Sequence, residues 1–349
     1  MKKLNQITLL LCAMLLLYSC EAENIVQPVD KVITLSAETL ILSPGSSQTL
    51  VATVTPATSD ALVWSSSDAS IASVFYGVVT AQKAGTTQIT ATCGQLSATC
   101  TISVVLKDYQ LVWSDEFNES TLNLNNWTIE VGGGGWGNQE KQYYTDRTDN
   151  LSFENGCLVL EAKKESYQSM AYTSARITSK NKQSFKYGKI EACLSLPSGG
   201  GTWPAFWMLG YGSWPTCGEI DIMEHTGNGP GWVSHAVHTR LKNGTNGRNW
   251  SQKVYKDNFE NEFHVYGIEW EETYELGDDL IRFLIDGEVT ATLWEPHNTD
   301  DFEQWPFNNN FYLIFNLAMG GNMGGTIDDT MFLNAVKMKV DWIRVYQRL

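Results

Sequence analysis

The stretch Cys217–His225, with the sequence CGEIDIMEH, is the most informative part of this 349-residue chain. Its two isoleucines alternate with Glu219 and Asp221, which predicts a β-strand with one apolar and one acidic face. Strict alternation would send Glu224 to the apolar face. A β-bulge near Met223 adds one residue and returns Glu224 to the acidic face. We therefore predict a bulged strand that presents three carboxylates on one side.

Carboxylates gathered on one face repel each other, which raises the proton affinity of at least one of them. Cleavage of a glycosidic bond with retention needs such a set, because one carboxylate attacks the anomeric carbon while a second, protonated, one serves the leaving oxygen. These two groups must lie roughly 5 to 5.5 Å apart, so the strand that bears Glu219 and Glu224 must curve. The alternatives are a solvated strand face and a calcium site.

Aromatic residues cluster just before the acidic strand. Residues 199–209 read GGGTWPAFWML, and Trp214 follows shortly after. Sugar rings stack on aromatic faces, so Trp203, Trp207 and Trp214 beside paired carboxylates predict a saccharide cleft. Core packing is the alternative for each tryptophan, above all for Trp207, which has apolar neighbours on both sides.

The segment TWPAFWML followed by GEIDIMEH resembles the signature of glycoside hydrolase family 16, in its laminarinase-like branch, over roughly residues 108–349. The extra residue in E-x-D-x-x-E is characteristic of that branch. The resemblance implies an all-β, concanavalin A-like jelly-roll sandwich and a retaining endo-β-1,3-glucan hydrolase. Glu219 would be the nucleophile, Glu224 the acid and base, and Asp221 the residue that controls the charge of Glu219. A mixed-linkage β-glucanase, an agarase or a carrageenase remain alternatives.

The same resemblance implies which residues contact sugar. Two segments would lie along the cleft, GNQEKQYYT at residues 137–145 and the glycine-rich NLAMGGNMGG at residues 316–325. His235 and His238 are three apart in a predicted strand, so they point to opposite faces and cannot share a zinc ion. We expect His235 to be structural. The residues that the resemblance places at the sugar, beyond the three tryptophans, are Asn138, Glu140, Tyr144, His238, Asn316 and Asn322.

A structural calcium ion is also implied by the resemblance, away from the catalytic residues. The matching positions are Glu116, Gly156 and Asp341, and oxygen ligands of this kind suit calcium. Local hydrogen bonding is the alternative explanation for the two acids. We expect no cofactor in the reaction itself.

The chain begins with a basic head and the apolar run Leu9–Leu17. This pattern predicts an export signal over residues 1–19. The ending Leu-Tyr-Ser-Cys resembles a bacterial lipobox, which implies a lipid on Cys20, a tether over residues 20–30 and attachment to the cell envelope at the outer membrane or cell surface. An ordinary signal cleaved elsewhere is the alternative.

Residues 31–106 predict a separate all-β domain, because short alternating runs are divided by Pro, Gly, Ser and Asp. Segments such as GVVTAQKAGTTQITAT closely resemble a bacterial immunoglobulin-like domain of group 2. We expect a spacer rather than a carbohydrate-binding module. Cys93 and Cys100 flank a predicted hairpin, so a disulfide between them is feasible but not required.

The net charge of −15 argues against binding to nucleic acid or to anionic membrane surfaces, since no basic patch offsets it. We expect a monomer with a polysaccharide as its partner. A surface glycan-binding lipoprotein and an adhesin are the alternatives from other functional classes. Neither explains three acids and three tryptophans so close together in the sequence.

Overall fold

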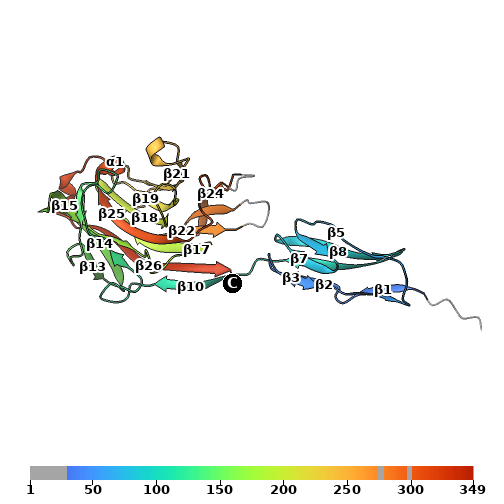
Figure 1. Cartoon of the computed structure of the whole chain (residues 1–349). Coiled ribbons are helices and arrows are strands. Elements are labelled where there is room, and N and C mark those ends of the chain that lie inside the picture. Colours follow the sequence, from blue (N-terminus) through green and yellow to red (C-terminus); the bar gives the residue numbers. More distant parts are fainter. Residues whose placement is uncertain (1–29, 273–278, 297–300, 349) are drawn as a thin grey trace, which may run out of the picture.

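The computed structural model describes residues 30–272, 279–296 and 301–348 (Figure 1). The predicted signal peptide (1–19), Cys20 and the tether up to residue 29 lie outside this part of the chain. Within it, no helix combines the length and the apolar character needed to cross a bilayer.

The first domain is a small β-sandwich, drawn in blue and cyan in Figure 1. Its described strands form the sheets β1-β4, β2-β9-β8-β5 and β3-β7-β6. Alternate residues of β8 and β9 are buried, as expected for strands with one face on a core. The strands are β1 (Val32–Leu35), β2 (Thr39–Leu42), β3 (Ser47–Thr49), β4 (Ala52–Thr55), β5 (Leu62–Ser66), β6 (Ala72–Phe75), β7 (Val78–Ala81), β8 (Gly85–Cys93) and β9 (Leu96–Val104).

The disulfide considered for this domain does not form, and both cysteines are free and buried. In the β8–β9 hairpin Cys93 lies opposite Leu96, whereas Cys100 lies opposite Ile89. Four residues of strand therefore separate the two cysteines along the ladder, which is about 13 Å. A disulfide requires Cα atoms within about 7 Å. Both side chains act instead as small apolar residues.

The second domain contains two large sheets, drawn in green to red in Figure 1. Among the described residues the ten-stranded sheet has the order β12-β15-β14-β26-β17-β22-β23-β24, with β10 paired to β26 and β13 to β14. The seven-stranded sheet has the order β11-β16-β25-β18-β19-β20-β21. The elements are β10 (Tyr109–Asp115), β11 (Thr128–Ile129), β12 (Gln142–Tyr144), β13 (Leu151–Glu154), β14 (Cys157–Tyr167), β15 (Met170–Ser174), β16 (Arg176–Thr178), β17 (Gly188–Ser195), β18 (Thr202–Gly210), β19 (Glu219–His225), β20 (Trp232–His238), η1 (Gly244–Asn246), β21 (Trp250–Tyr255), β22 (Phe263–Glu271), β23 (Leu280–Ile285), β24 (Glu288–Trp294), β25 (Phe311–Met319), α1 (Gly321–Gly324), η2 (Asp329–Leu333) and β26 (Val336–Arg348).

One hydrophobic core lies between the two large sheets and takes residues from both. All nine residues of β25 are buried; one face of the strand contributes alternate residues to this core, and the other face includes Asn316 and Ala318, which line a cleft. On β19 the core receives Ile220, Ile222 and Met223. The described helices and 3-10 turns span at most five residues each. The predicted all-β jelly-roll class, with a small Ig-like sandwich before it, is confirmed.

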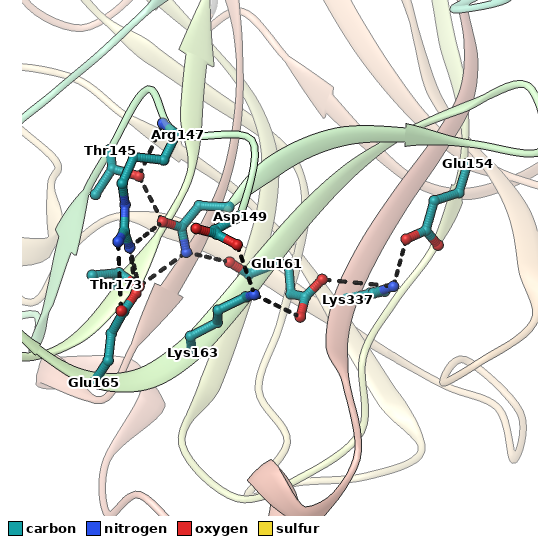
Figure 2. A network of polar contacts seen from close by, with 10 residues as sticks. Thr145, Arg147, Asp149, Glu154, Glu161, Lys163, Glu165, Thr173 and Lys337 are labelled. Carbon is teal, nitrogen blue, oxygen red and sulfur yellow. Dashed lines mark hydrogen bonds and ion pairs between the residues drawn. The ribbon is translucent and has the colours of Figure 1, made fainter. Parts of the chain in front are cut away.

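A polar network ties the segment after β12 to the ten-stranded sheet (Figure 2). The guanidinium of Arg147 pairs with Glu165 of β14 and donates to Asn150 Oδ1 at 3.0 Å. Farther along the network, Lys337 of β26 lies 2.6 Å from Glu154. The network fixes the chain directly after residues 137–144. Two residues of that segment, Asn138 and Glu140, lie near the acids of β19, so the network helps to hold this segment in place.

Candidate active site

The bulge predicted in the acidic strand is present. Between β18 and β19, Trp207 pairs with Asp221 and Phe206 pairs with Met223, so Ile222 has no partner on β18. The ladder between β19 and β20 shifts at the same place. Because the extra residue restores the phase, Glu224 returns to the side of the other two acids while the apolar residues between them enter the core.

The three carboxyl groups are held in a poorly solvated environment. Burial, followed by the negative charge of Asp221, raises the pKa of both Glu219 and Glu224. Burial also raises the pKa of Asp221 to about 8. Opposing these shifts, the indole N–H of Trp203 donates to Glu224 Oε1 at 3.1 Å. Such a site retains protons near neutral pH, as a general acid requires.

His238 of β20 lies opposite Glu219 and directs its Nε2 atom at the acids. Nε2 is 3.3 Å from Asp221 Oδ2 and 3.7 Å from Glu219 Oε1. The other ring nitrogen, Nδ1, accepts the backbone N–H of Gly244 at 3.0 Å. A neutral imidazole has one proton, so the proton is on Nε2 and faces the carboxylates.

This proton bears on whether the acids hold a metal. Glu219, Asp221 and His238 have ligand atoms within 4.8 Å of one another, which is a suitable spacing for a cation. A metal would take the lone pair of His238 Nε2 and move the ring proton to Nδ1. A proton on Nδ1 would face the backbone N–H of Gly244, and two donors cannot form a hydrogen bond with each other. The arrangement therefore suits a hydrogen-bonded carboxyl cluster better than a zinc site.

A cleft of about 600 Å³ opens above these acids. The three acids and eight of the nine residues predicted to contact sugar line it. Trp214 is 42 % exposed at its edge, whereas Trp203 is 9 % exposed and packs deeper. Trp207 is half-buried and donates its indole N–H to Asn316 Oδ1 at 2.7 Å, so this tryptophan lines the cleft rather than the core. The predicted residues on the lining are Asn138, Glu140, Trp203, Trp207, Trp214, His238, Asn316 and Asn322.

Comparisons with known proteins agree with this geometry. Residues 138–344 match the model of glycosyl hydrolases family 16, and residues 29–104 match that of the bacterial Ig-like domain, group 2. The chain belongs to glycosyl hydrolase family 16. Over 252 residues it is 43 % identical to a β-glucanase of Rhodothermus marinus, an alignment that covers 68 % of this chain and 85 % of that protein.

Solved structures of two laminarinases are equally similar. The laminarinase of Rhodothermus marinus superimposes with a TM-score of 0.65 and 41 % identity, over 70 % of this chain and 100 % of that one. A laminarinase from a Flavobacterium species gives a TM-score of 0.62 and 40 % identity, over 68 % and 100 % of the two chains. The family 16 chain is therefore a glycoside hydrolase, and the lectin and adhesin alternatives are set aside.

Tyr144 corrects the predicted set of sugar contacts. Its side chain is fully buried behind the cleft of the family 16 domain. The phenol donates to Glu140 Oε2 at 3.0 Å and accepts from Asn316 Nδ2 at 3.2 Å. Tyr144 therefore holds two cleft residues in place and does not itself meet substrate.

Arg176 is a cleft residue that the sequence did not indicate. Its guanidinium lies between the rings of Trp136 and Trp207, 4.7 and 4.8 Å from their centroids, and pairs with Glu130. It starts β16, opposite Asn316 of β25. A lone arginine in a strand has no motif, and only this cross-strand pairing brings it to the cleft. Asn249 and Thr245, from the segment after β20, also line the cleft and were missed.

The three positions predicted to hold calcium meet at one point of the family 16 fold. β10 and β14 both pair with the same edge of β26. The pairing with β10 ends at Ile343 and the pairing with β14 begins at Val340, so Asp341 has no strand partner on that edge. Glu116 follows β10 and Gly156 precedes β14. The Glu116 carboxylate is bound by Arg344 at 3.0 and 2.7 Å. The Glu116 side chain is thus already paired, whereas Asp341 Oδ1 has the Cys157 thiol as a neighbour, 3.8 Å away.

Proposed function

We propose that this chain is a retaining endo-β-1,3-glucan hydrolase that acts on laminarin-like polysaccharides. The observation that carries the proposal is the convergence of Glu219, Asp221 and Glu224 in a cleft lined by Trp203 and Trp207. The names of the relatives, β-glucanase and laminarinase, support the choice of glucan as substrate.

In the first step a Glu219 oxygen attacks the anomeric carbon and forms a glycosyl ester. The bond to the leaving sugar breaks as Glu224 gives its proton to the leaving oxygen. In the second step water attacks the same carbon and loses a proton to Glu224, which releases Glu219. Each step inverts the configuration, so the product keeps the β-configuration of the substrate.

The two glutamates have similar surroundings. Burial and the charge of Asp221 raise the pKa of each to about 8, and His238 together with one indole N–H, from Trp214 for Glu219 and from Trp203 for Glu224, opposes the shift. The assignment of Glu219 as nucleophile and Glu224 as acid therefore follows the order of the two residues in the family motif. Asp221, 4 % exposed, keeps a proton of its own or shares one with Glu219.

The substrate is tested by reducing-sugar release from laminarin, barley mixed-linkage glucan, agarose and carrageenan in parallel. We expect laminarin to be the best substrate, with products that are mixtures of oligosaccharides. Proton NMR of the first products should show the β-anomer before mutarotation. A preference for any of the other three polysaccharides, or an α-anomer first, would overturn the corresponding part of the proposal.

We also propose a structural calcium ion at the junction of β10, β14 and β26. Asp341, the backbone carbonyl of Gly156 and that of Glu116 would supply oxygens, and the side chain of Asn118 lies beside Gly156. A calcium ion here would join three strands that otherwise lack pairing at this point. Chelation should lower the melting temperature and added calcium restore it, while Asp341→Asn should abolish the response. A melting temperature that does not change with chelator would show that the protein holds no such ion.

The N-terminal residues support a proposal on location. Lys2, Lys3, the apolar run and the sequence LYSC at residues 17–20 favour export and lipid attachment at Cys20, with a spacer role for the Ig-like domain. In a bacterial host the full chain should fractionate with the envelope as a monomer. Cys20→Ala should release the enzyme into the soluble fraction, and an unchanged distribution would refute the anchor.

A further inference from the structure

The bulge that aligns the catalytic residues leaves a backbone group to be satisfied. On β20, Ala236 pairs with Asp221 and Ser234 pairs with Glu224, so Ile222 and Met223 both lie opposite one residue, His235. On the other side, β18 has no partner for Ile222. The carbonyl of Ile222 is therefore outside the regular ladder, in a region where water does not reach. A buried carbonyl of this kind needs a donor.

His235 supplies that donor through its own side chain. Its Nδ1 lies 2.6 Å from the carbonyl oxygen of Ile222, and the ring is fully buried. Because a carbonyl only accepts, Nδ1 must have the proton. Burial lowers the pKa of His235 to about 4, so the ring is neutral at the pH of most assays, with one N–H and with Nε2 free to accept.

The rest of the ring is fixed from the opposite sheet. Nε2 lies 2.9 Å from Thr290 Oγ1 on β24, and the ring stacks on Phe283 of β23 with centroids 4.8 Å apart and planes 25° apart. The Thr290 hydroxyl is also 3.1 Å from the carbonyl oxygen of Phe283, but its single proton serves only one of these two acceptors at a time. Polar contacts thus cross the apolar core, from the bulge of the seven-stranded sheet to the Thr290 side chain of the ten-stranded sheet. Nothing in ordinary core packing requires such contacts.

We propose that His235 is a positioning residue for catalysis, which holds the bulge of β19 and thereby the direction of Glu224. The inference rests on the proposed hydrolase function and adds a residue that touches neither substrate nor carboxylates. Glu224 follows the bulge by two residues. If the Ile222 carbonyl loses its donor, the strand relaxes towards regular alternation, and alternation turns Glu224 towards the core. Misplacement of a catalytic group by about 1 Å can cost about 100-fold in rate.

Four variants separate this role from simple packing. His235→Phe keeps the stacking on Phe283 but has no donor, whereas His235→Asn keeps an amide N–H near the position of Nδ1. Thr290→Val removes only the outer hydrogen bond. Phe283→Leu loosens the same part of the core and leaves both hydrogen bonds of His235 in place. All four are assayed on laminarin for kcat and KM, and their melting temperatures are recorded.

We expect kcat of His235→Phe to fall about 100-fold with KM within about threefold of the wild type. His235→Asn should recover most of this loss, and Thr290→Val and Phe283→Leu should keep kcat within about fivefold. If kcat instead follows melting temperature across all four variants, or if His235→Phe turns over like the wild type, the positioning role is wrong.

The tautomer provides a test that does not depend on activity. With only five histidines in the chain, ¹⁵N-labelled histidine gives a readable NMR spectrum. The wild type should show one ring with a slowly exchanging Nδ1–H and an unprotonated Nε2, and this signal should disappear in His235→Phe. An Nε2–H tautomer for His235 would overturn the inference even in an active enzyme. Conversely, wild-type protein that shows the expected tautomer but leaves laminarin intact would contradict the proposed function.

Discussion

The variant Asp221→Asn should become more stable than the wild type as the pH rises. Asp221 is 4 % exposed, the donor nearest to its Oδ2 is His238 Nε2 at 3.3 Å, and burial raises its pKa from 3.8 to about 8. An acid whose pKa is higher in the folded than in the unfolded state stabilises the fold fully below the unfolded pKa, and this contribution is lost as pH rises towards the folded pKa. Asparagine has the same shape and nothing to ionise, so the variant escapes the loss.

The size of the effect follows from the interval between the pKa of Asp221 in the unfolded state, 3.8, and its pKa in the folded state, about 8. Between pH 5.5 and pH 7.5 an isolated group of this kind would lose roughly 3 kcal/mol of stability, at ~1.4 kcal/mol per pH unit. Asp221 shares its protons with Glu219 and Glu224, so we expect about half, ~1.5 kcal/mol, to appear in the difference between variant and wild type. The variant should be almost inactive.

Urea denaturation followed by tryptophan fluorescence measures this difference, since all of the 13 tryptophans except Trp64 lie in the family 16 domain. The advantage of Asp221→Asn over wild type should grow between pH 5.5 and pH 7.5, and Asp257→Asn at an exposed aspartate should show no such growth. If Asp221→Asn is less stable than wild type at pH 7.5, the aspartate is ionised and stabilised by His238, and the reasoning is refuted.

Three further substitutions probe the cleft. Trp203→Phe removes the N–H that lowers the pKa of Glu224, so the alkaline limb of the kcat/KM profile should move up by about one pH unit; a shift to lower pH would contradict the acid role. Tyr144→Phe deletes a hydroxyl that holds Glu140 and Asn316. Because one hydrogen bond contributes ~1 kcal/mol, KM for laminarin should rise about fivefold while kcat stays nearly constant. An unchanged KM would mean that the hydroxyl does not order the cleft. Arg176→Lys cannot stack between Trp136 and Trp207, so calorimetry should show a lower melting temperature and binding of a laminarin oligosaccharide to inactive Glu219→Gln should weaken; an effect on neither would leave the stacked arginine without a role.

Several parts of the site were predictable because residue chemistry restricts the backbone. Three acids in CGEIDIMEH can face one cleft only if the strand gains a residue, and the bulge at Ile222 is where that residue enters. The spacing of His235 and His238 likewise placed them on opposite faces. The structure puts His238 at the carboxylates and His235 in the core. In both cases the alternation of a β-strand was enough.

Other parts depended on pairings that a single sequence does not contain. Tyr144 lies in a strand where alternation separates it from Tyr143 but does not say which of them meets the cleft. Arg176 reaches the site only through its register with Asn316, 140 residues later in the chain. For Cys93 and Cys100 the hairpin was correct, but its register set the two thiols four residues apart. Long-range register is set by the whole hydrophobic core, so local patterns cannot fix it.

The roles of the two glutamates are tested by comparing wild type, Glu219→Gln and Glu224→Gln in reducing-sugar release from laminarin, with circular dichroism to establish that all three are folded. We predict clear turnover by the wild type and a loss of at least about 1,000-fold in each variant, because nucleophile and acid are both required. A folded wild type that leaves laminarin intact, or a Glu219→Gln variant with wild-type turnover, would show that these two glutamates do not cleave β-1,3-glucan.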